Sequence, residues 1–199
     1  MTVEIKALTE EHLVRALPEL ARLRISVFRD WPYLYDGTAD YEQKYLARYA
    51  GIEGAVIVGA YDGDLLVGAA TGMPLDEEVP EFRQPFEDAG LNPSGIFYLA
   101  ESVLAPGYRG TGIGHAFFDK REAHARRFGF ERAAFCSVIR PQDHPLRPAG
   151  YRSLDPFWTK RGYRPLPDGI VHFPWKDVDR ETETEKPLQI WMGLLPGLR

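Results

Sequence analysis

The chain carries a glycine-rich loop, Tyr108-Arg109-Gly110-Thr111-Gly112-Ile113-Gly114, between an apolar run and an amphipathic segment. Residues 96–104 form the apolar run, whose aromatic and aliphatic side chains predict a buried strand. Residues 115–127 have apolar side chains at helical spacing and predict a helix. A glycine loop at the start of a helix directs unpaired N–H groups to one point, where the helix dipole adds positive potential. The stretch therefore predicts an anion-binding loop, and phosphate is the anion that it suits.

Two familiar phosphate-binding loops do not match this one. The glycines stand at 110, 112 and 114, so their spacing is GxGxG and not the GxGxxG of a dinucleotide-binding fold. The loop also follows a predicted hairpin, without a repeating βαβ pattern around it. A P-loop is excluded because no lysine followed by serine or threonine comes after the glycines.

Composition favours a globular protein with one domain over residues 1–199. Hydrophobic residues make up 44% of the chain and charged residues 27%, which is ordinary for such a domain. A net charge of −5 gives no electrostatic footprint for nucleic acid. The chain shows no signal peptide and no apolar run of membrane-spanning length, which predicts a cytoplasmic protein without a membrane partner.

Cysteine and histidine usage predicts no metal site. Cys136 is the single cysteine, which excludes an internal disulfide framework and a multi-cysteine zinc site, and its apolar neighbours predict an inert buried thiol. The five histidines lack metal-ligand spacing such as HExxH.

The remaining elements follow from periodicity and turn signals. Thr9 is a predicted helix N-cap, and an apolar stripe from Leu13 to Phe28 predicts the helix behind it. The charged segment 176–186 predicts a solvated hairpin tip. Further helices are predicted at 38–50, 82–89 and 154–161, and further strands at 3–8, 55–61, 65–72, 133–139, 170–175 and 188–195. This order predicts an α/β fold on a mixed sheet.

The segment Arg109–Gly114 resembles the R/Q-x-x-G-x-G/A acyl-CoA loop of the GNAT superfamily of N-acetyltransferases. The later stretch Phe157-Trp158-Thr159-Lys160-Arg161-Gly162-Tyr163 is similar to that superfamily's late helix and its terminal glycine–aromatic pair. The resemblance implies a mixed, mostly antiparallel central sheet flanked by helices, with splayed central strands. It also implies transfer of an acetyl group from acetyl-CoA to a primary amine of a small molecule or peptide, by direct attack of the amine.

The resemblance assigns the donor site residue by residue. The backbone amides of Arg109, Gly110, Thr111, Gly112, Ile113 and Gly114 would hold the coenzyme A pyrophosphate. The pantetheine arm would lie in a gap between the strand ending at Leu104 and the strand 133–139. Backbone groups of Ser102, Val103 and Leu104 would bind the arm and polarise the thioester carbonyl.

Direct attack by an amine needs a base for the ammonium proton and an acid for the leaving thiolate. Glu101 is the first candidate base, because it is a carboxylate inside the key strand. Alternation would place it on one face with Leu99 and Val103. The alternative is a glutamate that makes a salt bridge or faces solvent, with Tyr98 relaying the proton through water.

At the position of the acid that protonates the leaving thiolate, this chain departs from the superfamily's pattern. Its usual tyrosine in the late helix is replaced by Trp158, which cannot donate an acidic proton. Tyr151 is the candidate substitute, with Tyr163 behind it. The alternative is that each tyrosine packs with a satisfied hydroxyl. The departure also keeps open a second function, a catalytically inactive acyl-CoA sensor or interaction module.

The acceptor side is less specific. Aromatic and acidic residues between Asp30 and Asp36 suit a cationic amine, or pin an irregular loop to the core. Tyr41, Tyr45 and Tyr49 predict one packed helix face. Positive side chains near the expected mouth could contact a phosphate, an acidic part of the acceptor, or only solvent: Arg140, His144, Arg147 and Arg152. The terminal strands could also pair two copies of the chain as a homodimer.

Overall fold

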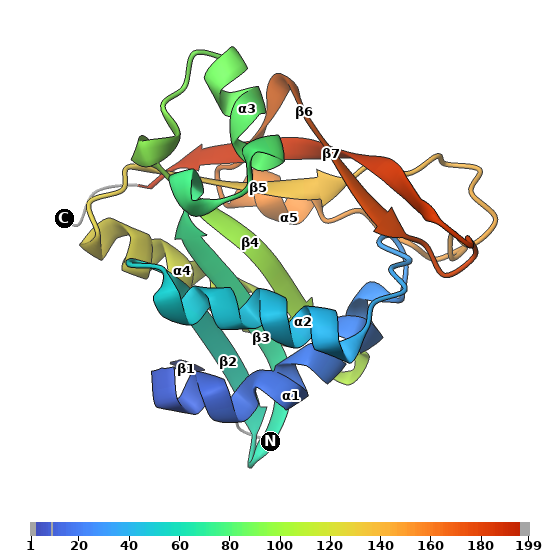
Figure 1. The fold of residues 1–199 in the computed structure, drawn as a ribbon, viewed down its shortest axis with the longest axis horizontal. Coiled ribbons are helices and arrows are strands. Elements are labelled where there is room, and N and C mark those ends of the chain that lie inside the picture. Colours follow the sequence, from blue (N-terminus) through green and yellow to red (C-terminus); the bar gives the residue numbers. More distant parts are fainter. Residues whose placement is uncertain (1–2, 9, 196–199) are drawn as a thin grey trace.

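A seven-stranded sheet runs through the centre of the molecule in the computed structural model, which describes residues 3–8 and 10–195 (Figure 1). The predicted N-cap Thr9 lies outside the described residues. The strand order is β1-β2-β3-β4-β5-β7-β6. The strands are β1 (Glu4–Ala7), β2 (Val56–Asp62), β3 (Leu65–Pro74), β4 (Ile96–Leu104), β5 (Arg132–Val138), β6 (Arg164–Lys176) and β7 (Glu183–Leu194).

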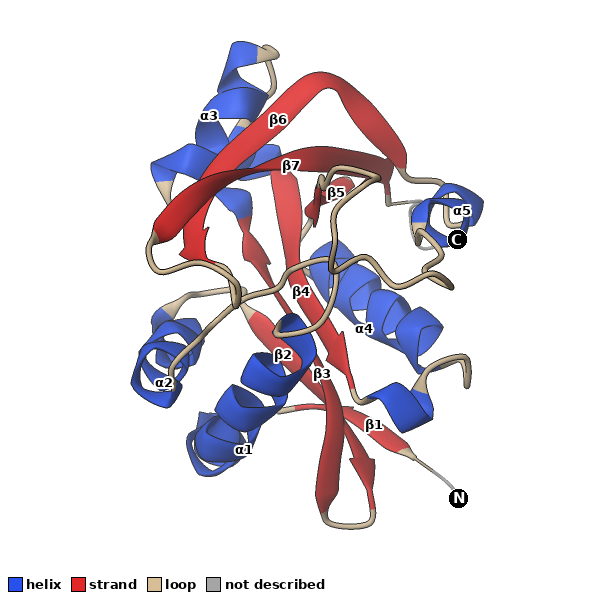
Figure 2. Cartoon of the chain, turned by 90° about the vertical axis from the view of Figure 1, so that its right-hand side faces the viewer, coloured by secondary structure: helices blue, strands red, loops and turns tan. Residues whose placement is uncertain are grey.

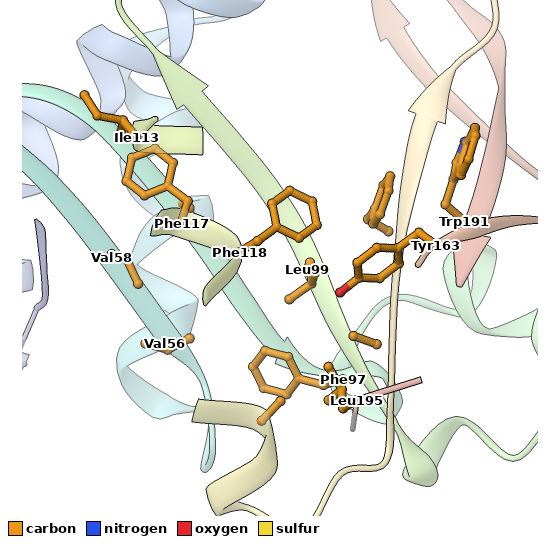
Figure 3. Packing of buried hydrophobic residues seen from close by; sticks show 14 of the residues in the cluster. Val56, Val58, Phe97, Leu99, Ile113, Phe117, Phe118, Tyr163, Trp191 and Leu195 are labelled. Carbon is orange, nitrogen blue, oxygen red and sulfur yellow. The ribbon is translucent and has the colours of Figure 1, made fainter. Parts of the chain in front are cut away.

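Helices cover both faces of the sheet (Figure 2). Apolar side chains of α1 and α2 pack on one face of β2–β4, while α4 packs on the other. Figure 3 shows Phe117 and Phe118 of α4 beside Val58 and Leu99 of the strands. The helices are α1 (Glu10–Phe28), α2 (Ala39–Ala47), α3 (Pro80–Asp88), α4 (Ile113–Arg127) and α5 (Asp155–Lys160).

The central strands β4 and β5 pair over only part of their length. They run parallel, and their register joins residues 96–98 to residues 132–134. Beyond Tyr98 the described part of β5 pairs with β7 and not with β4, so the two strands separate. All other strand pairs are antiparallel. The predicted mixed, mostly antiparallel sheet with splayed central strands is confirmed.

A β-bulge interrupts β4 where the splay begins. Thr71 pairs with Glu101, but Met73 pairs with Tyr98, so β4 has one extra residue between these pairs. A bulge breaks the two-residue alternation of side chains. Leu99 therefore packs under α4, whereas Val103 packs under α1 and α2. The expectation that Glu101 shares a face with both is wrong for Leu99.

The charged segment 176–186 is a hairpin tip, and its residues 179–185 are exposed as predicted, but the base of the tip is buried. Strands β6 and β7 extend into it, and the side chains of Asp177 and Lys186 are only 5% and 3% exposed. Lys186 Nζ lies 3.3 Å from Asp177 Oδ1, and Arg140 Nη1 lies 2.7 Å from Asp177 Oδ2. Arg140 also donates to the carbonyls of Pro32 and Tyr33. Because buried charges need partners, these groups join the hairpin to the connection between α1 and α2.

The buried cluster of Asp177, Arg140 and Lys186 predicts that the stability of the fold is sensitive to acid. Burial raises the pKa of Asp177, but hydrogen bonds and charge from Arg140 and Lys186 outweigh it and hold the pKa below the ordinary 3.8. The carboxylate therefore stabilises the fold above pH 3.8, and this contribution is lost as the pH falls through the lower folded pKa. We expect Asp177→Asn to lower the free energy of unfolding by about 2 kcal/mol at pH 7 and to weaken its decline in acid. Urea unfolding between pH 2.5 and 7 measures both, with the exposed Asp143→Asn as control; parallel curves for Asp177→Asn and wild type would contradict the assignment.

Candidate active site

The glycine loop leads directly into α4. A short 3-10 turn (Pro106–Tyr108) ends β4, and α4 begins at Ile113, two residues before the predicted start. Gly110 and Gly112 have φ of +77° and +91°, in the left-handed region that glycine tolerates. A Cβ added at either residue would meet no atom within 4 Å. The backbone of the loop is thus open on its outer side.

Several backbone amides of this loop are unpaired. Within the described part of the chain, the N–H groups of residues 110–114 have no hydrogen-bond partner. The loop is held from behind, because Thr111 Oγ1 donates to the Tyr108 carbonyl at 2.6 Å and the Tyr108 hydroxyl to Asp62 at 2.7 Å. Arg109 is exposed beside it. Free amides at a helix start with an adjacent arginine fit a pyrophosphate.

The predicted donor residues lie on one continuous backbone path. Ser102, Val103 and Leu104 follow the bulge on the part of β4 that pairs with β3 but not with β5, and the loop follows them. The Val103 side chain is buried under α1 and α2, while Ser102 Oγ accepts a hydrogen bond from Arg121 of α4. The path runs from the wide part of the splay to the first turn of α4.

Glu101 belongs to a buried ion cluster. Arg24 of α1 pairs with Glu42 of α2 and with Glu101 of β4. The Glu42 side chain is fully buried, whereas that of Glu101 is 16% exposed. The guanidinium also lies 4.6 Å from the centre of the Tyr45 ring. Glu101 thus makes the salt bridge of the alternative interpretation and keeps one side open.

Sequence reasoning missed Arg24 and Glu42. Arg24 stands four residues from both Leu20 and Phe28, within the buried stripe of α1. Glu42 stands four residues before the buried Leu46. A charge at an apolar helix position was the available signal, because such a charge needs a buried partner.

Tyr151 lies against the connection between α1 and α2. Its ring meets the Trp31 ring edge-on at 5.9 Å, and His144 lies 5.2 Å from the same tryptophan. Burial is the main cause that raises the pKa of Tyr151; Asp155 adds to it and Arg147 opposes it. The phenol is therefore protonated at neutral pH and able to donate a proton.

Tyr33 lies in the same connection between α1 and α2 as Trp31. Burial raises its pKa to about 12, with further contributions from Cys136 and Tyr151 and opposition from Arg24. Its ring packs 4.6 Å from Phe28 and 6.3 Å from Trp175. Tyr33 thus lies within electrostatic reach of both the ion cluster and Tyr151.

Other predicted residues have different surroundings. Tyr163 donates to Glu122 of α4 at 3.0 Å, and Trp158 packs against Phe135 and Trp191. Asp36 binds Arg29 and Lys176, each at 2.8 Å. The predicted packed face of three tyrosines is wrong for Tyr41, which is 53% exposed.

Cys136 and Tyr98 lie where the strands separate. Tyr98 of β4 and Cys136 of β5 influence each other's pKa across the two strands. Cys136 is partly exposed and not fully buried as predicted, but desolvation raises the pKa of its thiol to about 12, so the thiol is neutral.

Known proteins share the family and the fold of this chain. The family model described as "Acetyltransferase (GNAT) family" matches residues 20–149. The match covers well over half of the chain, so the chain belongs to the GNAT family of acetyltransferases. It is therefore an N-acetyltransferase enzyme. A search of curated proteins found no match.

Solved structures share the fold at low sequence identity. An aminoglycoside 6'-N-acetyltransferase complexed with coenzyme A aligns with a TM-score of 0.64 at 15% identity, over 98% of this chain and 99% of that one. A ribosomal-protein-alanine N-acetyltransferase from Brucella melitensis aligns with a TM-score of 0.63 at 15% identity, over 96% and 99%. The ribosomal-protein-S18-alanine N-acetyltransferase from Escherichia coli gives 0.59 at 12% identity, over 100% and 96%.

Over residues 3–8 and 10–195, the helices are too short or too polar to cross a bilayer. The same residues contain no group of three or more His, Cys, Asp or Glu side chains placed to hold a metal ion.

Proposed function

We propose that this enzyme transfers the acetyl group of acetyl-CoA to a primary amine of a small molecule or peptide, by direct attack of the amine. The observation that carries the proposal is the backbone path from the bulge in β4 to the unpaired amides of residues 110–114. Similar folds include a complex with coenzyme A. Acetyl-CoA supplies the activated acetyl group as a thioester.

Backbone groups of this path bind the donor. The amides of residues 110–114 hold the pyrophosphate, and backbone groups of residues 102–104 bind the pantetheine arm. The Arg109 N–H, also expected to bind the pyrophosphate, donates instead to the Pro106 carbonyl, so Arg109 contributes its exposed side chain. The arm lies in the splay, where β4 lacks a pairing partner on the β5 side. A backbone N–H aimed at the thioester oxygen stabilises the negative charge that develops there during attack.

Glu101 accepts the proton of the attacking amine, and Tyr151 protonates the thiolate. Glu101 is the carboxylate of the ion cluster that reaches the surface, while Glu42 is fully buried. Two carboxylates on one guanidinium leave a net negative charge, which favours a cationic amine. The rings of Trp31 and Tyr151, which meet edge-on, are suited to cation–π contacts with such an amine.

Free-thiol release from acetyl-CoA tests the proposal. We expect release that depends on an added amine, across a panel of aminoglycosides, diamines and peptides with free N-termini, with mass spectrometry locating the new amide. Isothermal titration with coenzyme A runs in parallel. Tight binding of coenzyme A without turnover of any amine would favour the inactive sensor, and absence of binding would contradict the donor site.

Tyr151→Phe tests the acid. Removing the phenol should lower kcat roughly 10- to 100-fold, because a positioned proton donor contributes at least this much. Affinity for acetyl-CoA should stay nearly intact, because the ring remains. Steady-state kinetics measure both quantities, with Tyr41→Phe on the exposed side of α2 as the matched control. An unchanged kcat would remove Tyr151 from the mechanism.

A further inference from the structure

A buried arginine of α4 reaches the bulge in β4. Arg121 is 1% exposed. Its Nη1 donates to the carbonyls of Thr71 and Glu101, both at 2.9 Å, and its Nη2 donates to Ser102 Oγ at 2.8 Å. These contacts join α4 to both strands at the point where the register shifts.

Carbonyl and hydroxyl oxygens, and not carboxylates, surround this cation. Within the described residues, no carboxylate lies within 4 Å of the Arg121 guanidinium. Burial lowers its pKa to about 10, so it stays protonated at neutral pH. A buried cation is costly, and an apolar side chain of similar size commonly stabilises a core as well or better. The contacts of Arg121 therefore indicate a role beyond packing.

Arg121 fixes the orientation of one peptide group. A planar trans peptide directs its C=O and N–H in opposite directions. The Glu101 carbonyl points to Arg121 together with that of Thr71 on β3, so the N–H of Ser102 points away from β3. Since β4 lies between β3 and β5 and its pairing with β5 ends at Tyr98, this N–H points into the splay.

The charge also strengthens this donor. A cation bound to the carbonyl end of a peptide polarises the group, and its N–H becomes a better hydrogen-bond donor. We infer that Arg121 is a positioning residue for the acyl donor: it holds and polarises the Glu101–Ser102 peptide, so that the Ser102 N–H binds the thioester carbonyl oxygen. The inference rests on the proposed function, which places the arm in the splay.

Two variants and a matched control test Arg121. Arg121→Met removes the cation, and Arg121→Lys keeps the charge without the fork of donors. Arg161→Met is the control, because both arginines lie over the Phe118 ring, at 5.1 and 5.0 Å, but Arg161 pairs with Asp119 and Glu122 of α4. Each variant is assayed for unfolding in urea, for kcat, and for the infrared stretch of ¹³C=O-labelled acetyl-CoA bound without acceptor.

We expect Arg121→Met to lower kcat of the folded enzyme roughly 10- to 100-fold, as for loss of an oxyanion donor, and to return the carbonyl stretch toward that of free thioester. Arg121→Lys should be intermediate, and Arg161→Met should change only stability. A wild-type carbonyl frequency in Arg121→Met would overturn the inference; if that variant does not fold, the same result in Arg121→Lys would do so. Failure of the proposed function gives a different result, because the wild-type enzyme itself would then not bind acetyl-CoA or would not shift its carbonyl stretch.

Discussion

Arg24→Met should lower the free energy of unfolding by about 4 kcal/mol, because it leaves Glu42 and Glu101 without their cation. Arg24 is 5% exposed and Glu42 is fully buried, so water cannot replace the lost partner. Urea unfolding at pH 7 measures the change through the transition midpoint, with an unchanged slope showing that the loss is in stability.

Two comparisons make this result specific to the buried cluster. Arg15→Ala removes an exposed pair with Glu11 on the same helix and should cost less than about 1 kcal/mol. Adding Glu42→Met to Arg24→Met removes one stranded carboxylate and should restore at least half of the loss. A loss below that of Arg15→Ala, or no recovery in the double variant, would show that the cluster does not act as a unit.

Gly112→Val should abolish most of the binding of coenzyme A. Its φ of +91° is a conformation that β-branched residues rarely adopt, and it is the residue immediately before α4. Relief of this strain turns the amides of residues 110–114 away from their common point. We expect affinity for coenzyme A, measured by isothermal titration, to fall by at least about 10-fold, because each lost charge-assisted hydrogen bond is worth about 1.5–3 kcal/mol.

Gly90→Val separates strain from binding. Gly90 also has a positive φ, of +70°, but it follows α3 and lies outside the proposed donor path. Both substitutions should lower the thermal midpoint by similar amounts, whereas only Gly112→Val should weaken coenzyme A binding. Equal affinities for coenzyme A in the two variants would remove the loop from the donor site.

Local patterns predicted most of the fold. The glycine loop, the strand before it and the helix after it all appear near their predicted residues, because propensity and turn chemistry act over a few residues. The family resemblance implied the splay, which the register of β4 and β5 confirms. The hairpin strands β6 and β7 were predicted too short, since Asp177 and Lys186 are polar in sequence but buried as partners.

The candidate site also combines local features, which the sequence predicts, with long-range contacts, which it does not. Contiguous backbone makes the donor path, so residues 102–104 and 109–114 could be proposed from one stretch of sequence. The ion cluster joins α1, α2 and β4, and Arg121 joins α4 to two strands. Such pairs are distant in sequence, and periodicity alone does not show which charges meet.

The sequence by itself predicted the family and placed the glycine loop before a helix, because glycine spacing and helix starts are local properties of the backbone. Tertiary structure alone decided the direction of Glu101 and the partners of the buried arginines. One extra residue in β4 reverses side-chain alternation beyond it, and only the pairing of β4 with β3 reveals where that residue is accommodated.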